Sequence, residues 1–187
     1  AYAFVYSDEI NMESVGVYLK EVLATHLPEN VENITLHLRE EVINSPYYHY
    51  THGLKKHDGN CQRIAHGHRS RIDIILDGKV CVESQQYWAD RWADIYIATR
   101  EDEIAYSDRK LKGQVSNEAD YYCFAYESSQ GYFELLIPKS DCEVIETDST
   151  VECLEQYLLE EQKKRTPDGV CQVIAYEGVG KGATVKG

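Results

Sequence analysis

The clearest alternation of apolar and polar positions lies in residues 66–76, HGHRSRIDIIL. The even-numbered positions of this segment form one row that changes from polar to apolar: His66, His68, Ser70, Ile72, Ile74 and Leu76. Successive side chains of a strand point to opposite faces. The pattern therefore predicts a strand whose two histidines share the face that continues into the core.

Other spacings predict further elements in the second part of the chain. Aromatic and apolar side chains recur at helical spacing over 83–101, so a helix is expected there, although 95–98 has strand character. Ser149 and Thr150 provide an N-cap for another helix. Alternation predicts strands over the remaining patterned segments: 47–52, 121–126, 132–137 and 169–177. The glycine-rich residues 178–182 lack P-loop spacing and are expected to be flexible backbone at the sheet edge.

The first part of the chain predicts strand, helix and strand over 1–8, 11–23 and 34–42. The end of the chain has the same order of elements. Glu152 precedes Tyr157 by five residues, as Glu13 precedes Tyr18. We interpret this similarity as an internal repeat.

The repeat predicts two domains. Residues 1–42 would be the C-terminal part of a first, truncated copy, and residues 43–187 a second, nearly complete copy. The second copy carries the histidine pattern.

Composition excludes several classes of protein. An apolar content of 43% with 27% charged residues is ordinary for a folded globular chain, and a net charge of −13 argues against a nucleic-acid-binding surface. No apolar run approaches eighteen residues, so no membrane span is expected. The six cysteines include no C-x-x-C pair, which is typical of reduced thiols and indicates the cytoplasm.

Residues 50–71 differ from the acidic average of the chain. They hold one acidic residue, Asp58, and five basic ones: Lys55, Lys56, Arg63, Arg69 and Arg71. This basic island indicates a small anionic ligand such as a phosphate, with a solvated basic loop as the alternative.

Three histidines of this region suit a metal site. His66 and His68 share a strand face, and His52 ends the preceding predicted strand. Three imidazoles leave one corner of a zinc tetrahedron open, which is the catalytic arrangement. Cys61 is either a fourth ligand of a structural site or, as we favour, a nucleophile or acid/base thiol, because basic neighbours and a nearby dication stabilise a thiolate.

Glu177 is a second candidate. It continues the apolar row of Val173 and Ala175 at the end of the last predicted strand. Such a carboxylate is either solvated at the strand end or accepts paired N–H donors from a heterocycle.

These residues together resemble a known family. The order is His52-Gly53-Leu54, then Cys61, then His66-Gly67-His68, followed by Thr150-Val151-Glu152 and Glu177. Over residues 43–187 it is similar to the 6-pyruvoyltetrahydropterin synthase and 6-carboxytetrahydropterin synthase family.

The resemblance implies the following fold and site. The fold would be the α+β tunnelling fold, an antiparallel sheet with two helices on one face, which oligomerises into a barrel. The histidines would bind catalytic Zn²⁺, Cys61 would act in proton transfer, and Thr150 and Glu177 would hold a pterin ring. The active site would lie at an interface of a homo-oligomer.

The resemblance also implies an activity. The substrate would be dihydroneopterin triphosphate, which agrees with the basic island. The enzyme would be a lyase like the 6-carboxytetrahydropterin synthase of queuosine and deazapurine biosynthesis. Two alternatives stay open: a tunnelling-fold enzyme like GTP cyclohydrolase, and a non-catalytic paralogue that binds pterin or purine.

One feature departs from the family pattern. The family has an Asp-His dyad shortly before the Thr-x-Glu helix, whereas residues 138–142 read PKSDC and no histidine follows His68. We hypothesise that the front of the first copy supplies the dyad across the boundary between copies. His57 is a local alternative.

Overall fold

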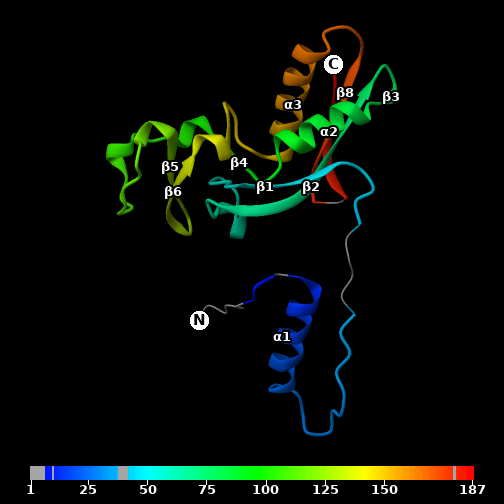
Figure 1. Ribbon diagram of the computed structural model, residues 1–187, viewed down its shortest axis with the longest axis vertical. Helices are drawn as coiled ribbons and strands as arrows, with labels where there is room; N and C mark the ends of the chain where they lie inside the picture. Colours follow the sequence, from blue (N-terminus) through cyan, green and yellow to red (C-terminus); the bar gives the residue numbers. More distant parts are fainter. Residues whose placement is uncertain (1–6, 10, 38–41, 179) are drawn as a thin grey trace. The chain divides into compact units, whose positions relative to one another are not determined.

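The computed structural model describes residues 7–9, 11–37, 42–178 and 180–187 (Figure 1). The chain divides into two compact units, 1–42 and 43–187. The division falls at the residue where the sequence indicates a domain boundary. The origin of the first unit as the end of a truncated copy stays a prediction.

The first unit contains the helix α1 (Met12–Ala24), which confirms the predicted helix. A capping box starts it, because the Asn11 side chain accepts from the Ser14 N–H at 2.9 Å and the Ser14 hydroxyl accepts from the Asn11 N–H at 3.1 Å. Residues 34–37 are not a strand, contrary to prediction. The predicted strand over 1–8 and the rest of that over 34–42 lie almost wholly outside the described residues.

The second unit is built on a mixed sheet of order β7-β4-β1-β2-β8-β9, with β3 also paired to β2. Its strands are β1 (Tyr47–His52), β2 (His66–Leu76), β3 (Lys79–Val80), β4 (Ile95–Thr99), β7 (Cys142–Ile145), β8 (Cys171–Glu177) and β9 (Lys181–Lys186). The pairing is antiparallel from β1 through β2 and β8 to β9, and parallel from β1 to β4 and from β4 to β7.

Two segments differ from the sequence prediction. The helix α2 (Val82–Arg91) ends well before residue 101, and Ile95–Thr99 form β4. Asp94 reverses the chain between them with a φ of 57°. The strand prevails because four of its five residues are buried and its backbone pairs with β1 and β7. In the glycine-rich C-terminal segment, the residues from Lys181 onward form β9 instead of flexible backbone.

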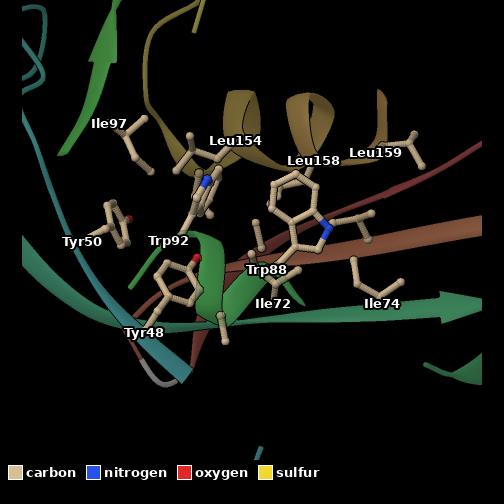
Figure 2. Close-up of a cluster of buried hydrophobic side chains, with 14 of the residues drawn as sticks. Tyr48, Tyr50, Ile72, Ile74, Trp88, Trp92, Ile97, Leu154, Leu158 and Leu159 are labelled. Carbon is tan, nitrogen blue, oxygen red and sulfur yellow. The ribbon is translucent and has the colours of Figure 1, made fainter. Parts of the chain in front are cut away.

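Helices α2 and α3 (Val151–Arg165) cover one face of this sheet (Figure 1). Trp88 of α2 and Trp92, which follows the last residue of α2, lie between the leucines of α3 and the aliphatic row of β2 (Figure 2). The indole N–H of Trp88 donates to the Gln162 side-chain oxygen at 2.9 Å, so this buried polar group is satisfied. The α+β class with two helices on one face is confirmed, but the sheet is mixed instead of wholly antiparallel, because β4 pairs in parallel with both β1 and β7.

A separate hairpin joins β5 (Tyr121–Ser128) to β6 (Gly131–Pro138), as the sequence predicts. Gly131 makes the turn with a φ of 115°. Phe124 of this hairpin packs with Tyr96 and Ala98 in a second, smaller core. Among the described residues, no helix is both long enough and apolar enough to cross a membrane.

Candidate metal centre

The pairing of β1 with β2 brings three imidazoles together. His52 lies opposite His66, and Tyr50 lies opposite His68, so all three histidines project from the face that carries the core. Their possible ligand atoms lie within 4.8 Å of one another. The ring centroid of His52 is 4.4 Å from that of His66 and 5.1 Å from that of His68. The predicted row of side chains therefore forms a cluster.

Hydrogen bonds at Nδ1 orient two of these rings. His52 Nδ1 lies 3.0 Å from the carbonyl oxygen of Ser149 and 2.9 Å from its hydroxyl. His66 Nδ1 lies 3.3 Å from the carbonyl oxygen of Arg63. A carbonyl only accepts, so each Nδ1 carries the proton and each Nε2 keeps its lone pair.

The Nε2 atoms of all three histidines are buried, and none has a hydrogen-bond partner among the described residues. Buried polar atoms are rarely left unpaired, so three in one cluster indicate a missing ligand. Burial and the other two imidazoles lower the pKa of His52 to about 3. Burial also lowers the pKa of His68. Neutral imidazoles are the form that binds a metal ion.

The donor set fits zinc. Three imidazole nitrogen donors on two paired strands match the ligands of a catalytic zinc ion, which keeps its fourth position for water or substrate. Among the described residues, the group within mutual ligand distance consists of His52, His66 and His68 and does not include Cys61. This arrangement favours an open site over a structural site with a cysteine ligand.

Glu177 lies beside the cluster. Its carboxylate is 3.6 Å from His68 Nε2, a contact too long for a hydrogen bond. The ammonium group of Lys181 donates to the same carboxylate at 2.7 Å across the β8–β9 turn. This hydrogen bond lowers the pKa of Glu177, which keeps the group ionised and able to accept N–H donors.

Ser149, the residue before Thr150, connects the start of α3 to the candidate metal centre. The Thr150 hydroxyl accepts from the Cys153 N–H at 3.4 Å, which confirms the N-cap. Ser149 is fully buried and contacts His52. No pattern along the chain indicates this contact, because the two residues are 97 positions apart.

Cys61 lies on a short 3₁₀ turn, Gly59–Gln62, in the loop between β1 and β2. It is partly buried, and its carbonyl oxygen accepts from the Leu54 N–H at 2.9 Å. The thiol is thus on the segment that joins the two strands carrying the three histidines, outside the group of possible ligands.

The basic island is neutralised at two of its members. Lys55 donates to Asp102 at 2.5 Å and to Glu101 at 2.9 Å. Lys56 donates to Asp148 at 3.0 Å. These two lysines are engaged by acidic side chains of the same chain, so the expectation that they attract an anionic ligand or stabilise a thiolate loses its support.

A sequence profile described as 6-pyruvoyl tetrahydropterin synthase matches residues 41–187. The chain belongs to this family. The match covers the whole second unit and all the histidines of the candidate metal centre. No curated protein matches the sequence.

Solved structures of the family share the fold. A Plasmodium vivax 6-pyruvoyltetrahydropterin synthase, solved as an alanine mutant of a catalytic glutamate, is 20% identical, with a TM-score of 0.50 over 78% of this chain and 94% of that chain. The Plasmodium falciparum enzyme is 15% identical, with a TM-score of 0.52 over the same shares. These likenesses confirm the tunnelling fold.

Residues 138–142, where the resemblance places an Asp-His dyad, have Asp141 followed by Cys142. Cys142, which follows Asp141, begins β7 and pairs with Tyr96. Burial raises the pKa of the Cys142 thiol to about 12. His57, the local alternative, is exposed on the loop that carries Cys61.

Proposed function

We propose that the chain is a zinc-dependent lyase of the pterin synthase type, similar to 6-carboxytetrahydropterin synthase, that acts on dihydroneopterin triphosphate. The observation that carries this proposal is the convergence of three unpaired imidazole nitrogens in a member of this family. The product would enter deazapurine (queuosine) biosynthesis. The six cysteines are all free, which supports the cytoplasm as the compartment.

Each site residue has a proposed role. His52, His66 and His68 would hold zinc, which when bound acts as a Lewis acid on the side-chain oxygens of the substrate. Cys61 would remove a proton bound to carbon. Glu177, held ionised by Lys181, would accept paired N–H donors of the pterin ring, and the Thr150 hydroxyl still has a proton to donate to the ring.

The test combines metal analysis with turnover. We expect about one zinc ion per chain, loss of zinc and turnover in His66→Ala, and loss of turnover with retained zinc in Cys61→Ala. His26→Ala is a matched control, because this exposed histidine lies in the first unit. Zinc-free wild-type protein, or undiminished zinc in His66→Ala, would contradict the metal centre. Full turnover in Cys61→Ala would contradict the thiol mechanism.

The buried Cys142 thiol favours a second candidate, pterin binding without turnover. Burial raises the pKa of this thiol to about 12, which disfavours the loss of its proton at neutral pH. This candidate predicts that zinc-loaded protein binds pterin in a titration but turns over neither dihydroneopterin triphosphate nor GTP. Turnover of GTP alone would instead indicate the activity of GTP cyclohydrolases.

We also propose that the chain forms a homo-oligomer with the site at a subunit interface. The sheet ends at β7 and β9, and the outer edges of both strands are unpaired among the described residues. Unpaired edges are ready to pair with another chain. The molar mass of the protein, measured by light scattering as it elutes from a size-exclusion column, tests this proposal. A monomer at micromolar concentration would contradict it.

A further inference from the structure

The loop between the metal-binding strands β1 and β2 comprises residues 53–65 and carries Cys61; we call it the cysteine loop. It follows His52 directly and ends one residue before His66. Its conformation therefore sets where the thiol lies relative to the three imidazoles.

The β5–β6 hairpin holds this loop on both sides of Cys61. The Tyr126 hydroxyl donates to the Gln62 carbonyl oxygen at 2.7 Å, and the Ser129 hydroxyl donates to the Gln62 side-chain oxygen at 2.9 Å. The Gln130 side-chain amide donates to the Gly59 carbonyl oxygen. Gln62 is only 3% exposed, and its hydrogen bond from Tyr126 is buried, whereas Ser129 is exposed and its hydrogen bond to Gln62 is partly buried.

The start of the loop is packed against the same hairpin. A Cβ atom at Gly53 would overlap the Tyr126 hydroxyl and would lie 2.8 Å from the Ile64 Cα. The Tyr96 hydroxyl of β4 donates to the Ile64 carbonyl oxygen at 2.7 Å. Tyr126 of the hairpin thus contacts both Gly53, the first residue of the loop, and Gln62, the residue after Cys61.

Ion pairs hold the cysteine loop at Lys55 and Lys56. Lys55 reaches Asp102, which is 7% exposed, and Lys56 reaches Asp148 just before α3. The cysteine loop is therefore held by the β5–β6 hairpin, by Asp102 after β4 and by Asp148 before α3.

We propose that Tyr126 and Ser129 are positioning residues that fix Cys61 for proton transfer at the site of the three histidines. The proposal rests on the proposed function, because it takes Cys61 as the acid/base group. Proton transfer requires heavy atoms within about 3 Å, and a misplacement of about 1 Å can cost about a hundredfold in rate. A 3₁₀ turn of four residues cannot supply that rigidity by itself, so the hairpin supplies it.

The experiment compares Tyr126→Phe and Ser129→Ala with wild type. For each protein we measure kcat and KM with dihydroneopterin triphosphate, zinc content, and the rate of Cys61 alkylation by iodoacetamide, read by peptide mass spectrometry with Cys153 as internal reference. We expect kcat to fall about tenfold with KM and zinc unchanged. We expect Cys61 alkylation to rise about fivefold, because the loop loses a hydrogen bond. Ser129→Thr, which keeps a hydroxyl, should restore most of kcat.

Tyr132→Phe is the matched control. Its hydroxyl lies on the same hairpin and donates to Glu134, away from the cysteine loop. Wild-type kcat and alkylation in both test variants would overturn the proposal, as would an equal loss in Tyr132→Phe. If the wild-type protein turns over no substrate, the proposed function fails. The alkylation rates still decide whether the hairpin holds the loop, and unchanged rates overturn the proposal.

Discussion

At the scale of single residues, the metal centre depends on which nitrogen of each imidazole carries the proton. Ser149 settles this for His52 with two acceptors at Nδ1, the carbonyl oxygen and the hydroxyl. Partners of this kind orient metal ligands and tune their affinity. Ser149, the residue before the N-cap of α3, is therefore part of the candidate metal centre together with His52.

We predict that Ser149→Ala weakens zinc binding about tenfold, because it removes one of the two acceptors and leaves the other. Titration of metal-free protein against a chromophoric chelator measures the change. Ser140→Ala is the control, since its hydroxyl donates to the neighbouring Asp141 on an exposed turn. Equal zinc affinity in Ser149→Ala and wild type would show that the hydroxyl has no part in the centre.

Thr150 permits a second prediction at this scale. Thr150→Ala should lower the free energy of unfolding by about 1 kcal/mol, because the Cys153 N–H loses its cap. Thr150→Ser should retain most of the stability of the wild-type protein. Urea unfolding measures the free energy of unfolding of both variants. If the proposed ring contact holds, Thr150→Ala also weakens pterin binding, whereas Thr150→Ser does not; equal stability of all three proteins would contradict the cap.

At the scale of elements, the hairpin β5–β6 and the end of β1 pack so closely that glycine is required at one position. Gly53 has no space for a Cβ atom beside Tyr126 and Ile64. Gly67, between two histidines of the candidate metal centre, does have space, because a Cβ there would lie 3.5 Å from the Thr51 Cγ2 atom. These two glycines form a matched pair.

We predict that Gly53→Ala destabilises the fold by about 1–3 kcal/mol through overpacking. Gly67→Ala should leave stability unchanged or raise it by up to about 1 kcal/mol, since alanine restricts the unfolded chain. Thermal unfolding of both variants measures the difference. A Gly53→Ala protein as stable as Gly67→Ala would show that the hairpin does not approach the cysteine loop this closely.

At the scale of the whole molecule, the buried core lies in the second unit. The buried apolar residues of the described chain all lie at Tyr48 or beyond, and α1 buries none of its residues. We predict that residues 43–187 alone unfold cooperatively with a free energy within about 0.5 kcal/mol of the full chain. Urea unfolding and zinc stoichiometry of the fragment check this. A fragment that melts without a cooperative transition would contradict it.

Much of this fold was predictable because its strongest signals are local. The row from His66 to Leu76 predicts β2 and the shared face of two histidines, and the Ser149-Thr150 pair predicts the start of α3. The prediction was wrong over 95–99, where helical spacing and strand composition compete within one short segment. These residues form a strand because they pair with β1 and β7, and this pairing is not encoded in any local sequence pattern.

The sequence by itself determined which residues could bind a metal ion, because the period of two in a strand fixes which side chains share a face. Only the tertiary structure decided how those residues are held. The Ser149 contact to His52, the acidic partners of Lys55 and Lys56, and the hold of Tyr126 on the cysteine loop each join residues 46 or more positions apart. Such contacts depend on the packing of whole elements, which periodicity along the chain does not encode.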